Sequence, residues 1–243
     1  MHSDVAIVIP SRLKSTRLYQ KPLQLIGLYT MIEHMLNQVK QTGLQNIYVA
    51  TDSHLIEDIV IKNGCKAIMT DENCPSGTDR VFSAVQLMQD SDHIEYIINV
   101  QGDMPFLEPN VILKLIENLK TSSFGIMTPV VKVDRQVADS NANVKVVANK
   151  DGKALYFSRS MVPFGSSEFL YHIGVYGFQK NTLTKFVELP QSFLEKQENL
   201  EQLRALENNI DIGIVFVDSV PISIDTESDL EKAIEFYNSN YKN

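Results

Sequence analysis

The sequence predicts an α/β protein whose mostly parallel sheet is flanked by helices, and three observations lead to this prediction. The first is an unbroken apolar run at residues 5–9, which is typical of a parallel strand buried on both faces. The second is the alternation of short apolar runs with stretches of helical spacing up to about residue 100. The third is a polar cluster after each of three predicted strands. Because the carboxyl ends of parallel strands form the crevice where α/β sheets bind ligands, these clusters predict a binding site.

Helical spacing and short apolar runs predict the helices and strands of the first half of the chain. We expect Pro10 to end the first strand, because proline has no N–H to donate to the ladder. Helices are predicted at residues 30–41, at residues 53–63 and through Val81, Val85 and Met88, and strands at residues 47–50, 67–69 and 94–100. This order predicts parallel strands joined by right-handed crossovers.

The pattern changes at about residue 125. Residues 125–180 are predicted to be an antiparallel extension of the sheet and a candidate dimer contact within a single domain of residues 1–243. Its strands are predicted at residues 126–133, 144–148, 153–159 and 172–178. We then expect one amphipathic helix at residues 193–206, a strand at 212–217 and a final helix with Thr226 as its N-cap.

Charge narrows the class of ligand. The net charge is −8, from 22 cations and 30 anions, which disfavours a general nucleic-acid binder. Four cations nevertheless crowd into the loop after the first strand: Arg12, Lys14, Arg17 and Lys21. Taken alone, they are equally well explained as a solvated surface loop. At the end of a parallel strand, they favour a small anionic ligand such as a polyphosphate.

Cysteine usage and hydropathy indicate the compartment. Cys65 and Cys74 form neither a metal-binding spacing nor a disulfide framework. The N-terminus lacks the pattern of a signal peptide, and the apolar runs are far shorter than the roughly 20 residues of a membrane span. We therefore expect a soluble, cytoplasmic protein with no membrane partner.

Short motifs follow one another in a fixed order from about residue 5 to residue 233. They are Ile9-Pro-Ser-Arg12, Ser15-Thr-Arg17, Lys21-Pro22, Val49-Ala-Thr-Asp52, Ser76-Gly-Thr-Asp-Arg80, Asn99-Val-Gln-Gly-Asp103, Val144-Lys-Val-Val147, Ala154-Leu-Tyr-Phe-Ser-Arg159, His172-Ile-Gly-Val-Tyr176, Leu200-Glu-Gln-Leu-Arg204 and Asp225-Thr226. The ordered set resembles the 3-deoxy-manno-octulosonate (Kdo) cytidylyltransferases, or CMP-Kdo synthetases. The resemblance implies a Rossmann-like nucleotide-diphospho-sugar transferase fold, Mg²⁺ as cofactor and a homodimer. It also implies that CTP and Kdo give CMP-Kdo and pyrophosphate, for lipopolysaccharide or capsule synthesis.

The chain departs from this family pattern at three places. Tyr19-Gln20 stands where the family commonly has Pro-Gly, and Met104 where Glu or Gln is frequent. The segment between Pro163 and His172 is short. These departures bear on loop flexibility and on sugar specificity rather than on the reaction.

The resemblance also implies roles for individual residues on the nucleotide side. The catalytic residues would be Arg12, Lys21 and Asp103, and the Mg²⁺ ligands Asp103 and Asp225. The nucleotide would be bound by Pro10, Ser11, Arg12, Ser15, Arg17, Lys21, Ser76, Arg80 and Gln101. Structural alternatives stay open: a turn role for Asp103, a helix cap for Asp225, and capping and a surface ion pair for Ser76 and Arg80.

The acid sugar would be bound by Arg159, His172, Tyr176, Glu201 and Gln202, as the resemblance implies. Arg159 would hold its carboxylate. The spacing of His172, Gly174 and Tyr176 predicts that they share one face of a strand, although a lone buried histidine is more often a core residue.

Other functions stay open to different degrees. The same reaction on 8-amino-Kdo fits the motifs, whereas activators of nonulosonic acids such as sialic acid usually carry Gly-Ser-Lys in place of Ser15-Thr-Arg17. A non-catalytic nucleotide-binding subunit is disfavoured because both Asp103 and Asp225 are present. A dinucleotide oxidoreductase is excluded because only Gly27 lies near the first turn.

Overall fold

The structure is a computed structural model that describes residues 2–89 and 91–241. Its contacts divide the chain into two compact units. Unit 1 comprises residues up to 94, residues 99–112 and the chain from 221 onward, and unit 2 comprises residues 95–98 and 113–220. The prediction of a single domain with a dimer contact in residues 125–180 is not tested by this division and stays a prediction.

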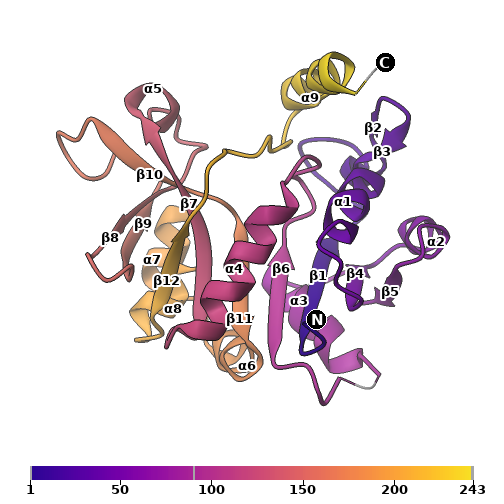
Figure 1. Ribbon diagram of the computed structural model, residues 1–243, viewed down its shortest axis with the longest axis horizontal. Helices are drawn as coiled ribbons and strands as arrows, with labels where there is room; N and C mark the ends of the chain where they lie inside the picture. Colours follow the sequence, from indigo (N-terminus) through magenta and orange to yellow (C-terminus); the bar gives the residue numbers. More distant parts are fainter. Residues whose placement is uncertain (1, 90, 242–243) are drawn as a thin grey trace. The chain divides into compact units, whose positions relative to one another are not determined.

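Unit 1 contains the predicted parallel strands. β1 (Val5–Ser11) pairs in parallel with β4 (Ile47–Thr51), which pairs in parallel with β5 (Lys66–Met69) (Figure 1). Residues 5–9 are all fully buried, as the apolar run predicts. The expectation that Pro10 ends the strand is wrong, because Pro10 pairs with Ala50 and β1 continues to Ser11. In a parallel ladder successive N–H groups serve opposite neighbours, so one missing donor removes one bond and not the strand.

Side chains cap the starts of three helices of unit 1, whereas the helix that begins at His54 has no side-chain cap hydrogen bond. α1 (Met31–Lys40) has a capping box formed by Thr30 and Glu33. α2 (His54–Lys62) and α3 (Gly77–Leu87) follow, and the Ser76 side chain accepts the hydrogen bond of Asp79 N at the start of α3. α9 (Glu227–Asn240) has Thr226 as its N-cap, as predicted. These side-chain caps satisfy N–H groups that a helix start leaves without partners.

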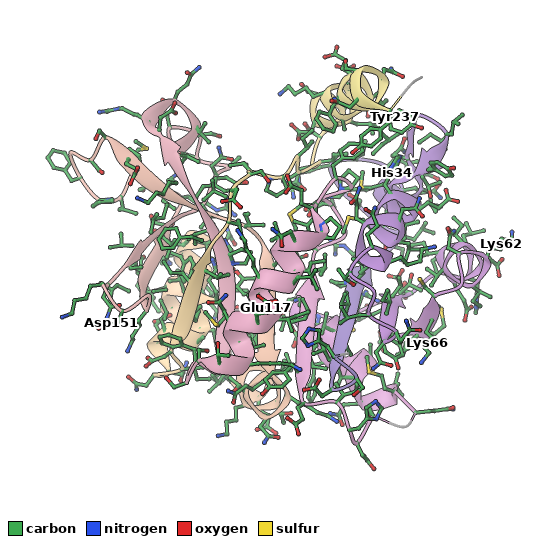
Figure 2. The ribbon with its side chains drawn as sticks, in the orientation of Figure 1. His34, Lys62, Lys66, Glu117, Asp151 and Tyr237 are labelled. Atoms are coloured by element: carbon green, nitrogen blue, oxygen red, sulfur yellow. The ribbon has the colours of Figure 1, made fainter. Side chains whose placement is uncertain are left out.

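α9 packs on a small hairpin that the sequence did not predict. After the 3₁₀ turn η1 (Lys21–Leu23), β2 (Leu25–Ile26) and β3 (Tyr29–Thr30) form an antiparallel pair joined by Gly27-Leu28. Tyr237 of α9 lies against this turn, and its ring centroid is 5.4 Å from that of His34 (Figure 2). Gly27 has φ of +66°, and a Cβ there would overlap the Tyr237 ring. Glycine is therefore required both for the turn and for the approach of α9.

Two elements have residues in both units. β6 (Tyr96–Val100) was predicted, whereas α4 (Pro109–Thr121) was not. The signal for α4 was present in the helical spacing of its buried residues: Val111, Ile112, Leu115, Ile116 and Leu119. The same omission affects two helices of unit 2, α5 (Arg135–Ala138) and α6 (Lys180–Glu188).

Unit 2 is built on β7 (Ile126–Asp134). β12 (Ile212–Phe216) pairs with it in parallel, while β10 (Glu168–His172) and β11 (Val175–Gln179) pair with it antiparallel (Figure 1). β8 (Lys145–Ala148) pairs antiparallel with β10 on one side and with β9 (Ala154–Ser158) on the other. The predicted change from parallel to antiparallel pairing is therefore confirmed.

The predicted single strand at residues 172–178 is wrong. His172 pairs with Val130 at the end of β10, and the ladder resumes in β11, where Gly177 pairs with Met127. The two strands are separated by a bulge at residues 173–174, where the Thr128 hydroxyl lies 2.8 Å from the carbonyl oxygen of Val175. A buried side-chain hydroxyl thus satisfies backbone that the ladder leaves unpaired, which strand periodicity alone does not reveal.

The predicted single helix at residues 193–206 is also wrong. It is divided into α7 (Phe193–Glu198) and α8 (Leu203–Glu207). Asn199 ends α7 with φ of 52°, a left-handed conformation that asparagine tolerates and that commonly stops helices. Among the helices of the described residues, none is long and apolar enough to cross a membrane.

Candidate active site

All nine residues predicted to bind the nucleotide line one cavity of about 290 Å³ in unit 1. Three chain segments form most of it: the end of β1 with the basic loop, the start of α3, and the loop after β6. Asp103 and Asp225 lie on the same wall. The cavity also includes residues that the sequence reasoning did not select, namely Thr16, Pro22, Cys74, Pro75, Gly77 and Gly102.

Lys21 lies between the two predicted metal ligands. Its Nζ is 2.9 Å from Asp225 Oδ1 and 3.4 Å from Asp103 Oδ2, and the Arg17 guanidinium is 3.1 Å from Asp225 Oδ1. The backbone holds the carboxylates together, because Ile224 N donates to the Asp103 carbonyl oxygen at 2.9 Å. Asp225 is not the cap of α9, since Thr226 has that role. The helix-cap interpretation of Asp225 is therefore wrong.

The charges around Asp103 bear on whether a metal fits here. Burial raises the pKa of Asp103, Lys21 lowers it, and the neighbouring charge of Asp225 raises it. Within the described residues, no group of three or more His, Cys, Asp or Glu side chains is arranged to hold a metal ion. Two carboxylates beside a loop rich in cations nevertheless suit Mg²⁺ with a phosphate ligand, because Mg²⁺ commonly takes one or two carboxylates and completes its shell with phosphate oxygens and water. The residues present fit such an ion.

Ser76 and Arg80 line the cavity and also have structural partners. Ser76 Oγ lies 2.6 Å from Asp79 Oδ2, and it accepts from Asp79 N at 3.1 Å as the cap of α3. Arg80 donates to Thr70 Oγ1 at 2.6 Å and forms an ion pair with Asp52 at 3.4 Å. This pair is buried, with side-chain exposures of 4% and 8%, so the surface ion pair considered for Arg80 is not what forms.

Asp52 ends the motif Val49-Ala-Thr-Asp52, and the sequence alone assigns it no role. Its second oxygen, Oδ1, accepts from Leu13 N at 2.9 Å. Asp52 therefore connects the buried Arg80 to the backbone of the basic loop, and it fixes where that loop leaves the sheet. The signal for it was its position directly after β4, at the same sheet edge as the other two clusters.

The other loop residues differ in exposure. Arg12 and Arg17 are exposed, whereas Ser15 and Gln101 are half-buried. Ser11 is 4% exposed, and its hydroxyl has no hydrogen-bond partner within the described residues. Such a group facing a cavity is available to a ligand, since buried polar atoms are otherwise satisfied. Lys14 forms an exposed ion pair with Glu72 at 2.9 Å and does not line this cavity.

The five residues predicted to bind the acid sugar all lie in unit 2, and three of them are shown to interact. His172 and Tyr176 have ring centroids 5.4 Å apart, and Glu201 acts on the charge state of Tyr176. Burial lowers the pKa of His172 to about 3, so its ring is neutral at pH 7. Burial, aided by the charge of Glu201, raises the pKa of Tyr176 well above its usual value. Both rings are therefore uncharged at pH 7, and His172 Nε2 lies 2.9 Å from the buried Thr128 hydroxyl.

Gln202 and Arg159 have different surroundings. Gln202 is 6% exposed, and its Nε2 has no partner within the described part of the chain. The Arg159 guanidinium donates to the carbonyl oxygens of Glu198 at 3.0 Å, Asn141 at 3.2 Å and Asn199 at 3.5 Å. These bonds connect Arg159 to the segment that leads from α7 to Glu201 and Gln202, rather than to His172 or Tyr176.

Comparison with known proteins agrees with this geometry. A family model described as cytidylyltransferase matches residues 6–212. A 3-deoxy-manno-octulosonate cytidylyltransferase of Rickettsia canadensis (strain McKiel) is 58% identical over 236 residues, which cover 97% of each chain. The enzyme of the same name from Rickettsia massiliae (strain Mtu5) is also 58% identical, over 97% of this chain and 96% of that protein.

Solved structures agree as well. A CMP:2-keto-3-deoxy-manno-octonic acid synthetase complexed with CTP is 33% identical, with a TM-score of 0.91 and coverage of 98% of this chain and 99% of that one. A putative glucose-1-phosphate thymidylyltransferase from Bacillus anthracis is 16% identical, with a TM-score of 0.69 over 96% and 94% of the two chains, and shows the fold alone. The predicted α/β nucleotidyltransferase fold is therefore confirmed, and the chain belongs to the 3-deoxy-manno-octulosonate cytidylyltransferase family.

Proposed function

We propose that this protein activates Kdo with CTP, giving CMP-Kdo and pyrophosphate. The observation that carries the proposal is the 58% identity over nearly the full length of relatives that bear this name. The synthetase whose structure contains CTP, with a TM-score of 0.91, supports CTP as the nucleotide. The cavity adds a basic loop beside two carboxylates, which is the charge pattern that a triphosphate and its cation need.

In this reaction the anomeric hydroxyl oxygen of Kdo forms a bond to the α-phosphorus of CTP. The bond from that phosphorus to the bridging oxygen breaks, the electron pair leaves with pyrophosphate, and the hydroxyl proton passes to solvent. Positioning and charge neutralisation carry most of the catalysis in such displacements. We assign the triphosphate to Arg12, Arg17 and Lys21, and the nucleobase to the region of Ser11, Arg80 and Gln101.

Asp103 and Asp225 would hold Mg²⁺, which neutralises charge on the phosphate oxygens when it is bound. Lys21 contacts both carboxylates, so its ammonium balances them in the nucleotide-free protein. When the triphosphate enters, the same ammonium is within the cavity to bind a phosphate oxygen as a point charge.

The acid sugar is assigned to Arg159, His172, Tyr176, Glu201 and Gln202. Three backbone carbonyls take three of the five N–H groups of Arg159, which leaves two without a partner in the described residues. A forked pair of N–H groups is what a carboxylate binds best. Neutral His172 and Tyr176 suit the sugar hydroxyls, and the described residues offer no hydrogen-bond partner to Gln202 Nε2.

The experiment measures pyrophosphate release with CTP, Mg²⁺ and a panel of Kdo, 8-amino-Kdo and sialic acid, with a no-sugar blank. We expect the highest kcat/KM with Kdo. A higher value with 8-amino-Kdo would transfer the assignment to that sugar, and no release with any acid sugar would support a non-catalytic subunit.

Asp103→Asn is the matched inactive control for this assay. We expect it to remain folded and to lose most turnover, because a neutral amide cannot hold the cation on the phosphates. A chelator should stop the wild type, and added Mg²⁺ should restore it. Near-native activity of the variant would remove Asp103 from the metal site.

We further propose that the product serves lipopolysaccharide or capsule synthesis and that the enzyme is a cytoplasmic homodimer. The pathway follows from the sugar that the relatives are named for. Light scattering of the purified protein tests the dimer, because one chain of 27.4 kDa and a pair differ twofold in mass.

A further inference from the structure

Ionised side chains from other elements hold both backbone polar groups of Arg159. Its N–H donates to Glu198 Oε2 at 3.0 Å, and its carbonyl oxygen accepts from Lys145 Nζ at 2.5 Å. Hydrogen bonds to charged groups are about twice as strong as neutral ones. The backbone at Arg159, just after β9, is therefore held more tightly than a strand end requires.

Lys145 is fully buried in β8, and its ammonium donates three hydrogen bonds to backbone carbonyls. These belong to Arg159 at 2.5 Å, Asn143 at 2.6 Å and Ser140 at 3.2 Å. All three N–H groups are used, which is the condition for burying an ammonium. Burial and the charge of Arg159 lower the pKa of Lys145, while Glu198 and Asp139 raise it. An apolar side chain would fill this place without the desolvation free energy that a buried ammonium costs. Stability therefore does not explain the lysine, which points to a positioning role.

Glu198 holds the same site from the end of α7. Its Oε1 accepts from Ser158 Oγ at 2.8 Å and from Tyr156 OH at 3.3 Å, while its own carbonyl oxygen accepts from Arg159 Nε at 3.0 Å. The guanidinium also reaches the carbonyl oxygen of Asn199. Glu198 therefore bonds the backbone N–H and the side chain of Arg159 through separate oxygen atoms.

We propose that Lys145 and Glu198 are positioning residues that fix the Arg159 guanidinium for the carboxylate of the acid sugar. This inference rests on the proposed function. Lys145 fixes the carbonyl group of Arg159 and the loop at residues 140–143. Asn141 in this loop also accepts a hydrogen bond from the guanidinium. Glu198 fixes the backbone N–H of Arg159 and the position of the adjoining turn at residue 199. Neither side chain needs to touch the sugar, because each acts through the direction in which two N–H groups of Arg159 point.

The first test is Lys145→Met, which keeps an unbranched side chain and removes the three donors. We expect KM for Kdo to rise about 10-fold or more, while KM for CTP changes less than about twofold. A 10-fold change corresponds to about 1.4 kcal/mol, close to the lower end of the roughly 1.5–3 kcal/mol that one hydrogen bond to a charged group contributes. The matched control is Lys132→Met in β7, where the lysine forms an exposed pair with Glu168 at 2.9 Å. We expect this control to leave both KM values unchanged.

A double-mutant cycle separates positioning from general stability. Arg159→Ala alone should raise KM for Kdo, and adding Lys145→Met to it should change KM by less than about twofold, because the group being positioned is gone. The proposal would be overturned if the effects of Arg159→Ala and Lys145→Met on KM for Kdo multiplied in the double variant. It would also be overturned if Lys145→Met raised KM for CTP as much as KM for Kdo. Wild-type KM values in Lys145→Met would overturn it as well.

Glu198→Gln is the second variant, and it retains an acceptor while losing the charge and one acceptor oxygen. It should show the same selective rise in KM for Kdo. Added to Arg159→Ala, it should change KM for Kdo no further. If neither Lys145→Met nor Glu198→Gln folds, the two residues are structural and the proposal fails. A wild type that releases no pyrophosphate with any acid sugar refutes the proposed function too, whereas an active wild type with unaffected variants refutes only the positioning role.

Discussion

The ammonium of Lys21 contacts two carboxylates that come from distant parts of the sequence. A divalent cation bound by Asp103 and Asp225 would compete with this ammonium for the same oxygens. Replacing Lys21 should therefore have opposite effects on the two proposed ligands of the cavity, the metal and the triphosphate. It would remove a competitor of the proposed metal, and it would remove a cation from the proposed triphosphate site.

For Lys21→Met we expect tighter binding of Mn²⁺ to the nucleotide-free protein and a KM for CTP raised about 10-fold, the effect of losing one charge-assisted bond. Titration followed by electron paramagnetic resonance measures the first, and steady-state kinetics the second. The melting temperature should change little, because Asp103 and Asp225 are partly exposed. Weaker binding of both ligands would contradict the competition.

His172 makes stability depend on pH in a defined window. Its pKa is about 3 in the folded protein against 6.5 for a free histidine, so the unfolded chain binds more protons between these values. Stability should therefore be complete above about pH 6.5 and fall as the pH is lowered toward 3, by up to about 1.4 kcal/mol per pH unit from this residue. Urea unfolding at pH 7 and pH 5 measures the free energy of unfolding, which should fall less between these pH values for His172→Gln than for the wild type. Equal losses would show that His172 does not control this window.

At the scale of elements, the docking of α9 decides where Asp225 lies. The helix packs through Leu230 and Ala233 on a buried cluster that includes Ile26 and Met31, and Tyr237 covers the Gly27 turn. Asp225 directly precedes the N-cap of this helix. The position of a proposed metal ligand thus depends on a tight turn in another part of unit 1.

Gly27→Ala tests this dependence, and Gly43→Ala is its matched control. Both glycines have positive φ, at +66° and +73°, but only a Cβ at Gly27 meets another side chain within 4 Å. We expect Gly43→Ala to cost about 1–2 kcal/mol from backbone strain alone. Gly27→Ala should cost at least 1 kcal/mol more, as overpacking does, and should lower activity. Equal losses of unfolding free energy in denaturant titrations would mean that Tyr237 moves aside freely.

At the scale of the whole molecule, the predicted nucleotide residues belong to unit 1 and the predicted sugar residues to unit 2. Arg159→Ala should therefore raise KM for Kdo and lower kcat/KM by about 10- to 150-fold, while CTP binding stays nearly unchanged. The effect should shrink when the carboxylate of the sugar is replaced by a neutral amide, since Arg159 then has little to lose. Comparable losses for CTP would place Arg159 on the nucleotide side or in the scaffold.

Local sequence by itself determined the features that depend on neighbouring residues. The buried β1, the capping box of α1, the Thr226 cap and the change to antiparallel pairing all follow from periodicity and capping chemistry. The motif order also identified the family, and the residues assigned to the nucleotide share one cavity. These features could be predicted because strand ends, caps and cation clusters are properties of short segments.

Only the tertiary structure decided the features that depend on contacts between distant residues. The bulge after His172 exists because Thr128 on another strand satisfies its backbone, and Pro10 stays in β1 because β4 supplies a partner. The burial of Lys145 and Arg80 likewise needs acceptors that no local pattern announces. Desolvation makes such polar groups costly unless distant partners bond them, so their positions are set by the folded chain as a whole.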